Sequence, residues 1–221
     1  WYRGDGTGAY ESSPISWDAT YVPQAGDLEH FLKGVLYIDG VEMLDTVVWF
    51  SKLPVLYVAT EDGADIVVKT EPKNATVRLQ GNAQFKEQYD GAAEIKGRGN
   101  SSWGFPKKPY KLKLDKKTDL FGFGKNKHWV LLANYFDESQ LRNKTAYDMS
   151  GKFGLTYQDS TWVVVVFNGR YDGVYQLGEH IRVDATRVNV HDWEGDADVV
   201  DETDLSTIDT TTRDITGGYL W

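Results

Sequence analysis

The sequence predicts an α+β protein, built mainly of antiparallel β-sheet with one main helix. Three observations predict this fold class. Short apolar segments rich in β-branched and aromatic residues alternate with turn sequences along most of the chain. Only one long segment, residues 137–154, has the four-residue apolar spacing of a helix. Hydrophobic residues make up 41% of the 221 residues, which is enough for a folded core and excludes a disordered chain.

The first eighty residues predict a loop followed by strands. Residues 1–27 are rich in Gly, Ser, Asp and aromatic side chains and lack a sustained period, so we expect an extended opening segment. Apolar stretches at 35–38 and 44–50 flank Asp39-Gly40, a dipeptide typical of tight turns, which predicts a β-hairpin. Further antiparallel strands are expected at residues 53–60, 65–70 and 76–80.

The middle of the chain predicts strands and then the helix. Apolar side chains recur every four residues from Leu141 to Phe153, after the acidic start Asp137-Glu138-Ser139. Gly154 is a common helix-stop residue, so the helix is expected to begin near Asp137 and to end near Gly154. Strands are expected before it at residues 91–96, 110–114 and 128–134.

A second hairpin is the last clear pattern. Asn168-Gly169, a pair typical of type I′ turns, joins apolar runs at 162–167 and 174–181. Beyond it, residues 184–214 are strongly acidic with few large apolar side chains, which predicts a solvated, mobile insertion. Apolar packing is expected to resume only at residues 217–220.

The overall charge and the residue types present exclude several function classes. The net charge of −9 argues against nucleic-acid binding, because phosphate backbones require a broad basic face. No cysteine is present, which excludes disulfides, thiolate metal sites and a cysteine nucleophile. No run of about 18 apolar residues occurs, so no membrane span is expected. The acidic runs lack the spacing of a calcium loop and the histidines are scattered, so we expect no metal site.

Residues 94–114 carry the strongest functional pattern. Glycine lets a turn bring backbone N–H groups close to an anion, and the Ser and Asn side chains of this segment add short donors. On the strand that follows, Lys111 and Lys113 share a face, so both can converge on one anion. The segment therefore predicts a phosphate or nucleotide site, although an ordinary hairpin with a solvated basic face has the same composition. Its spacing matches neither a Walker A loop nor the G-x-G-x-x-G motif.

Side chains around this segment leave two interpretations open. Trp103, Phe105 and Tyr110 interleave with the basic residues and could stack on a purine or a sugar, or could simply cap the sheet. Arg142, early on the predicted helix, could pair with the acids before it or reach a phosphate with its planar fork.

Seven segments, taken in order and with their spacing, carry a resemblance to one known family: residues 96–103, 106–114, 129–135, 141–143, 167–169, 173–175 and 217–220. From about residue 53 to its end, the chain resembles the CotH kinase family, the spore coat protein H-like domains. The resemblance implies a fold like the small lobe of an atypical protein kinase. It also implies a secreted, cell-surface or spore-associated bacterial protein that binds ATP with Mg²⁺ or Mn²⁺ and phosphorylates Ser or Thr of proteins. Scaffold or polysaccharide-degrading modules are implied as further partners.

The same resemblance implies positions for the nucleotide site, without identifying a catalytic residue. The turn at 98–102 would cover the phosphates, and the phosphate-pairing lysine would be Lys108, Lys111 or Lys113. Glu179 lies where a kinase-like fold passes toward its large lobe, and its role stays open. The nucleotide-binding residues expected are Arg98, Asn100, Ser101, Ser102, Lys108, Lys111, Lys113, Arg142 and Glu179.

The expected organisation has two parts. Residues 1–50 form an N-terminal β extension, and residues 51–221 form the CotH-like part. Family members continue past Gly217-Gly218-Tyr219-Leu220 into a C-terminal half with metal-holding acidic motifs, so we expect this chain alone to be inactive. The alternative is a non-enzymatic extracellular surface or carbohydrate-associated module, which exposed aromatic side chains would favour because sugars stack on flat rings.

Overall fold

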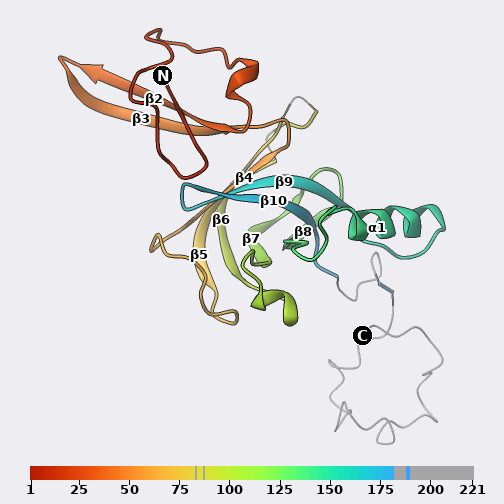
Figure 1. Ribbon diagram of the computed structural model, residues 1–221. Helices are drawn as coiled ribbons and strands as arrows, with labels where there is room; N and C mark the ends of the chain where they lie inside the picture. The colour runs from red at the N-terminus through yellow and green to blue at the C-terminus, as the bar shows by residue number, and fades with distance from the viewer. Residues whose placement is uncertain (83, 87, 182–187, 190–221) are drawn as a thin grey trace, which may run out of the picture.

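Two β structures make up the computed structural model, which describes residues 1–82, 84–86, 88–181 and 188–189 (Figure 1). One is a three-stranded sheet, in the order β1-β2-β3, and the other is a closed barrel of seven strands. The strands are β1 (Tyr2–Gly4), β2 (His30–Ile38), β3 (Val41–Phe50), β4 (Val55–Thr60), β5 (Lys73–Gln80), β6 (Tyr89–Gly97), β7 (Tyr110–Asp119), β8 (Lys125–Leu132), β9 (Ser160–Phe167) and β10 (Arg170–Glu179). The helical elements are η1 (Ala25–Asp27), η2 (Ser101–Gly104) and α1 (Arg142–Lys152).

The barrel corrects the predicted fold class. Its strands follow the order β10-β8-β7-β6-β5-β4-β9, and β4 and β9 pair in parallel, with Val55 opposite Val164, while all other neighbours are antiparallel. The protein is mostly β with one short α-helix, and the expected resemblance to the small-lobe sheet of a kinase is wrong because this sheet closes on itself. Closure leaves no free sheet edge. It depends on a contact between segments more than a hundred residues apart, which local sequence patterns do not reveal.

The barrel interior is filled by side chains that alternate with outward-pointing ones along each strand. On each strand every second side chain points inward, and most of those side chains are aliphatic or aromatic, with Glu179 of β10 among the exceptions. Trp129 on β8 is completely buried, and its indole N–H donates to the carbonyl oxygen of Asn126 at 3.2 Å. Other inward residues include Leu56, Val77, Ile95, Leu112, Leu131, Val165 and Leu177.

The two predicted hairpins are confirmed, and one predicted strand is wrong. Asp39 and Gly40 join β2 to β3, and Asn168 and Gly169 join β9 to β10, all four with positive φ as a type I′ turn requires. Residues 65–70 form no strand. Both edges of β4 are already paired, with β5 and β9, so the neighbouring segment has no strand edge to join.

Helix α1 is shorter than predicted and begins five residues later. The carboxylate of Asp137 accepts the backbone N–H of Arg142 at 2.7 Å and the hydroxyl of Ser139 at 2.6 Å, so the acidic start holds a turn before the helix. No residue of α1 is buried, and the apolar residues Leu141, Met149 and Phe153 are exposed. Figure 1 shows α1 extending away from the barrel.

The three-stranded sheet packs on the barrel through aromatic side chains. Trp49 of β3 stacks on Tyr171 of β10 with ring centroids 4.6 Å apart, and its backbone N–H donates to the hydroxyl of Tyr57 at 2.8 Å. The apolar cluster at this junction also contains Phe31, Val55, Val164 and Val166.

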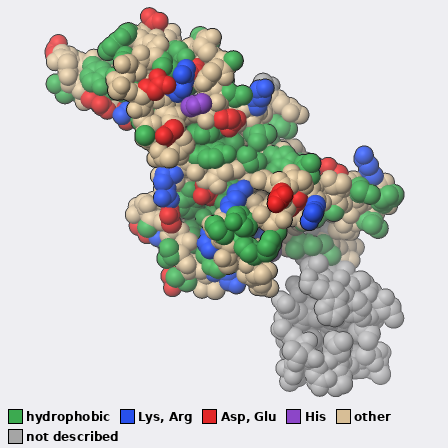
Figure 2. Space-filling model, in the orientation of Figure 1, with side chains coloured by type: hydrophobic (Ala, Val, Ile, Leu, Met, Phe, Trp, Pro, Cys, Tyr) green, Lys and Arg blue, Asp and Glu red, His purple; other side chains and the backbone are tan. Residues whose placement is uncertain are grey.

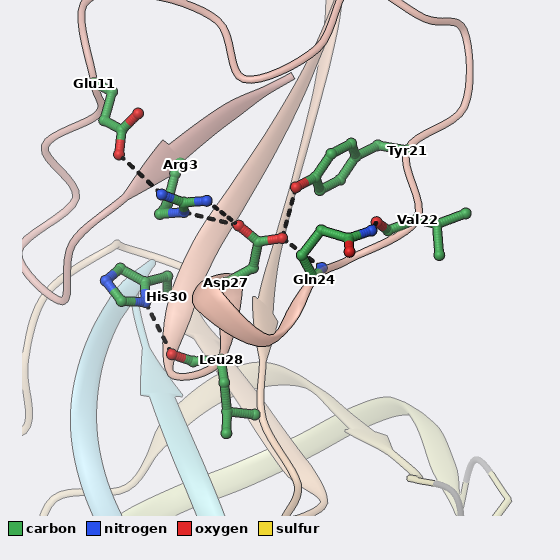
Figure 3. Close-up of polar contacts among 8 residues, drawn as sticks. All are labelled: Arg3, Glu11, Tyr21, Val22, Gln24, Asp27, Leu28 and His30. Atoms are coloured by element: carbon green, nitrogen blue, oxygen red, sulfur yellow. Dashed lines mark hydrogen bonds and ion pairs between the residues drawn. The ribbon is translucent and has the colours of Figure 1, made fainter.

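A buried carboxylate organises the opening segment, which the sequence predicted only as an extended loop (Figure 3). Asp27 is completely buried and accepts hydrogen bonds from Arg3, the hydroxyl of Tyr21 at 2.6 Å and the backbone N–H of Gln24 at 2.7 Å. Arg3 binds it through two nitrogens, Nε at 2.8 Å and Nη2 at 2.6 Å. The carboxylate therefore ties β1, the loop at 21–24 and η1 together.

The predicted acidic insertion at 184–214 lies outside the described residues except for residues 188 and 189, and so does the apolar segment at 217–220. Within the described residues, no helix has the length and apolar character needed to cross a membrane.

Candidate functional site

The basic glycine-containing segment forms the connection between β6 and β7. The backbone N–H of Arg98 donates to the carbonyl oxygen of Pro109 at 3.1 Å and closes the base of this loop, residues 98–109. Gly99 has a φ of +84°, and a Cβ at this position would lie 2.0 Å from Oγ of Ser102. Glycine is required here because the left-handed backbone and the serine leave no room for a side chain.

Three lysines hold the loop in place. Nζ of Lys108 donates to the carbonyl oxygen of Trp103 at 2.8 Å, and Nζ of Lys69 donates to that of Gly99 at 3.1 Å. Nζ of Lys107 donates to the carbonyl oxygen of Val174, and burial lowers the pKa of this lysine. Lys108, one of the predicted phosphate-pairing lysines, thus has a structural partner.

A group of cations on the outside of the barrel has no acidic partner. Strand register places Lys96 of β6 directly opposite Lys111 of β7, and alternation places both on the outer face, together with Arg98. We call Lys96, Arg98 and Lys111 the basic group. Within the part of the chain that the structure describes, none of the three forms a side-chain hydrogen bond or ion pair. Like charges directly opposite each other destabilise a sheet, so this arrangement has an electrostatic cost.

The electrostatic effect of the basic group is visible in two pKa shifts. Burial lowers the pKa of Lys111, and the charges of Lys96 and Arg98 lower it further. Burial also lowers the pKa of His180, at the end of β10, with additional lowering by all three cations of the basic group. A bound anion would relieve this mutual repulsion.

Lys113 differs from Lys111 although the two share a face. Nζ of Lys113 lies 2.8 Å from Oε2 of Glu94, the residue opposite it on β6. Both lysines line a small cavity of about 210 Å³, whose other lining residues are Pro72, Glu94, Lys96 and His128. The ion pair neutralises Lys113 locally, so Lys96 and Lys111 carry the net positive charge of this cavity.

A second cavity, of about 360 Å³, lies between the loop, the end of β8 and the start of α1. Arg98, Ser102 and Arg142 line it, together with the rings of Phe105, Tyr135 and Phe136. Arg142 is largely exposed, and its Nε is 3.7 Å from the carboxylate of Asp137. The cavity therefore combines two guanidinium groups, a hydroxyl and apolar rings, the mixture typical of sites for polar small molecules.

Glu179 does not lie with the basic group. It is buried on the inner side of β10, where its carboxylate accepts a hydrogen bond from Nδ2 of Asn126 at 2.6 Å. Register places it opposite Trp129, whose side chain points into the barrel, whereas Lys111 points outward. Glu179 therefore pairs with Asn126 at the end of the barrel, where it also lines a cavity of about 540 Å³.

The structure therefore brings some predicted site residues together and separates others. Arg98, Ser102 and Arg142 line one cavity, Lys111 and Lys113 line the next, and Lys108 and Glu179 have structural partners. Asn100 and Ser101 are exposed on the loop. The sequence prediction missed Lys96. The alternation that paired Lys111 with Lys113 also puts Lys96 on the same face as Arg98, but only the register shows that it faces Lys111.

Gly97 provides a test of the loop geometry. A Cβ at this position would lie 2.5 Å from Cζ3 of Trp103, so Gly97→Ala must displace the indole that packs over β6. We expect a loss of about 1–3 kcal/mol in the free energy of unfolding, with a changed near-UV circular dichroism spectrum. Gly104→Ala, in the same loop but facing open space, is the control and should change neither quantity. Equal behaviour of the two variants would contradict the packing described.

The described residues contain no group of three or more His, Asp or Glu side chains placed to hold a metal ion.

Comparisons with known proteins agree with the resemblance found in the sequence. No curated protein matches the chain. The family described as CotH kinase protein matches residues 95–215, which is more than half of the chain and includes the loop, the basic group and α1. The chain therefore belongs to the CotH kinase family.

Proposed function

We propose that this chain binds ATP and serves in the phosphorylation of Ser or Thr side chains of proteins. The observation that carries the proposal is the basic group: Lys96, Arg98 and Lys111 converge on one outer face beside a glycine-containing loop and have no acidic partner among the described residues. Membership of the CotH kinase family supports the same conclusion.

The chemistry of the basic group suits a triphosphate. A guanidinium presents two parallel N–H donors to phosphate oxygens, and two ammonium groups add point charges beside it. Because the three cations repel one another in the free protein, part of the binding free energy would come from relief of that repulsion. Arg142, largely exposed on the rim of the neighbouring cavity, is placed to contact the ligand as well.

The aromatic rings that line the cavity of about 360 Å³ suit the purine of ATP. Phe105 and Tyr135 lie nearly parallel, with centroids 5.4 Å apart and an angle of 13° between the planes, and Phe136 meets Phe105 edge-on. Tyr135 and Phe136 remain exposed, so a flat base can stack on them without displacing a core side chain. Arg98 lines this cavity, and its charge also lowers the pKa of Lys111 on the barrel face. The base and the phosphates would therefore bind on opposite sides of Arg98.

Phosphoryl transfer by kinases generally uses Mg²⁺ or Mn²⁺, which neutralises phosphate charge. The described residues offer basic groups for phosphate but no cluster of carboxylates for the metal, so they do not fit a metal site and we derive no step through the ion. Family membership further leads us to propose coat-type proteins as substrates, at the surface of a bacterial cell or spore, with scaffold or polysaccharide-degrading modules as further partners.

Calorimetric titration with ATP, with and without Mg²⁺, tests the proposal. We expect Arg98→Ala and Lys111→Ala each to weaken ATP binding by about tenfold or more, as loss of a charge-assisted contact does. Lys113→Ala is the matched control on the same face, and we expect a change of less than about threefold because Glu94 already pairs with this lysine. Titration with adenosine and with inorganic triphosphate separates the contributions of rings and cations.

Two outcomes would contradict the proposal. If the unaltered protein binds neither ATP nor triphosphate, the basic group is not a nucleotide site and the non-enzymatic module becomes the better interpretation. If Lys113→Ala weakens binding as much as Lys111→Ala, the phosphates do not bind at the basic group as proposed.

A further inference from the structure

The three-stranded sheet of β1, β2 and β3, which we call the N-terminal sheet, carries a cavity of about 500 Å³ that lies outside the residues matched by the family. Three parts of the chain line this N-terminal cavity: residues 1 and 2, the loop at residues 14–19, and the facing strands β2 and β3. Figure 2 shows hydrophobic and acidic side chains next to one another at the surface of the N-terminal sheet, above the barrel. A cavity of this volume has the size of a site for a small organic molecule.

Two indoles line the N-terminal cavity and offer flat rings to a ligand. Trp17 is 83% exposed, although tryptophan is on average one of the more buried residues of a folded protein. Trp1 packs closely on Gly34 of β2, where a Cβ would lie only 3.0 to 3.2 Å from three atoms of its ring. The lack of a side chain at Gly34 therefore makes room for the indole against the strand. Leu36 and Leu44 complete the apolar part of the lining.

Hydrogen bonds hold the loop that carries Trp17. The backbone N–H of Ile15 donates to the carbonyl oxygen of Trp1 at 2.7 Å, and the amino nitrogen of Trp1 donates to the carbonyl oxygen of Ser16 at 2.7 Å. The backbone N–H of Asp18 donates to the hydroxyl of Ser16 at 3.0 Å. The residues on both sides of Trp17 are therefore held in place. Less conformational freedom is lost when a ligand binds to a ring that is already positioned in this way.

Carboxylates and a phenol lie beside the two indoles. Asp18 lines the cavity and is exposed, and its carboxylate accepts a hydrogen bond from the hydroxyl of Ser16 at 3.3 Å. A carboxylate can accept several more, so Asp18 has capacity for the hydroxyls of a ligand. Asp45 and Tyr37 also line the cavity and are about half exposed, Asp45 with its carboxylate 3.0 Å from Nζ of Lys33. The N-terminal cavity thus combines flat apolar rings with hydrogen-bond acceptors.

We propose that the N-terminal cavity binds a neutral oligosaccharide of β-1,4-linked hexoses. The equatorial hydroxyls of such sugars leave C–H groups on the two faces of each ring, which pack on indoles, and the hydroxyls at the ring edges donate to carboxylates. Because the chain of sugars is extended, successive rings can contact Trp17 and Trp1. The carboxylates of the cavity and the net charge of −9 disfavour an anionic polysaccharide.

The volume of the cavity separates this ligand from the other class that aromatic rings and carboxylates bind together. Quaternary ammonium groups are held by such rings through cation–π contacts. One ammonium group is much smaller than a cavity of about 500 Å³, whereas several linked sugar rings fill it. The site is on the N-terminal sheet and does not depend on the ATP site proposed above.

Calorimetric titration of the unaltered chain with cellotetraose, a β-1,4-linked tetrasaccharide of glucose, tests the proposal. We expect binding together with a blue shift of tryptophan fluorescence, because the ring of Trp17 leaves water when a sugar stacks on it. Trp17→Ala should weaken binding by about tenfold or more, and Trp17→Phe, which keeps a flat ring, should weaken it less. Phe153→Ala removes another largely exposed ring, at the end of α1, and is the control that should leave binding unchanged.

Two further readouts keep the proposal separate from a general disturbance of the fold. Far-UV circular dichroism and the affinity for ATP should both stay unchanged in Trp17→Ala, because the exposed indole supports neither the core nor the basic group. Failure of the unaltered chain to bind cellotetraose would overturn the proposal, and so would equal binding by Trp17→Ala. Equal affinity for maltotetraose, the α-1,4-linked isomer whose chain curves, would also overturn it, as would binding of choline without binding of cellotetraose.

Discussion

Trp129→Ala is expected to lower the free energy of unfolding by about 3–5 kcal/mol, the largest loss we predict for one side chain of this protein. The indole is completely buried inside the barrel, with its N–H bonded to the carbonyl oxygen of Asn126. Its removal leaves a cavity among inward side chains of several strands, which a closed barrel cannot easily fill by collapse. Urea denaturation followed by far-UV circular dichroism measures the loss.

Two variants calibrate this result. Trp129→Phe keeps an aromatic ring and loses the N–H donor, so we expect a smaller loss. Val67→Ala alters a largely exposed side chain and should change the free energy of unfolding by less than about 0.5 kcal/mol. A loss of less than about 1 kcal/mol for Trp129→Ala would show that the barrel interior is not a packed core.

Asp27→Asn is expected to cost about 3 kcal/mol in the stability of the N-terminal sheet. The carboxylate accepts four hydrogen bonds and donates none: two come from Arg3, one from Tyr21 and one from Gln24. In either orientation of an asparagine amide, its NH₂ group faces an N–H donor of Arg3 or Gln24 and leaves that donor without an acceptor. Hydrogen exchange of the amides in β1 and β2 measures the effect on this sheet.

The control for Asp27 uses the other acid beside Arg3. Nη1 of Arg3 is 3.4 Å from the carboxylate of Glu11, which is about half exposed. Exposed ion pairs contribute little, so Glu11→Gln should cost less than about 0.5 kcal/mol. If the two variants have equal effects, the buried network of Figure 3 does not organise the sheet.

The pH dependence gives a second test of the same carboxylate. Burial alone would raise the pKa of Asp27, but hydrogen bonds from Tyr21, Gln24 and Arg3 outweigh it and hold the pKa below its ordinary value. The carboxylate therefore stabilises the fold above the pKa of an unfolded aspartate, about 3.9, and this contribution is lost as pH falls through the lower folded value. We expect the stability difference between the unaltered protein and Asp27→Asn to shrink below about pH 4.

The basic group lies within the residues that match the CotH kinase family. Its cations lie on two adjacent strands of the barrel, so their spacing is fixed by a sheet whose edges are all paired. A rigid support of this kind keeps repelling charges close together when no ligand is bound. Asn100 and Ser101 are exposed on the loop that follows β6, and Nζ of Lys108 in the same loop donates to the carbonyl oxygen of Trp103.

The sequence by itself determined the tight turns of this protein and the strands that flank them. Turn chemistry at Asp39-Gly40 and Asn168-Gly169 predicted both hairpins correctly, because positive φ at these residues depends only on the dipeptide and its neighbours. The spacing of residues 96–114 likewise predicted a basic glycine-containing segment between two strands. The strand expected at 65–70 shows the limit of such patterns, since a segment with strand-like composition also needs a free edge to pair with.

Only the tertiary structure decided how the strands close and which cations remain unpaired. The parallel contact of β4 with β9 closes the barrel, and the register of β6 with β7 places Lys96 opposite Lys111 and Glu94 opposite Lys113. Two lysines with the same sequence pattern therefore differ in charge environment. The physical reason is range: alternation and turns follow from neighbouring residues, whereas closure and register depend on the packing of side chains that are distant in the chain.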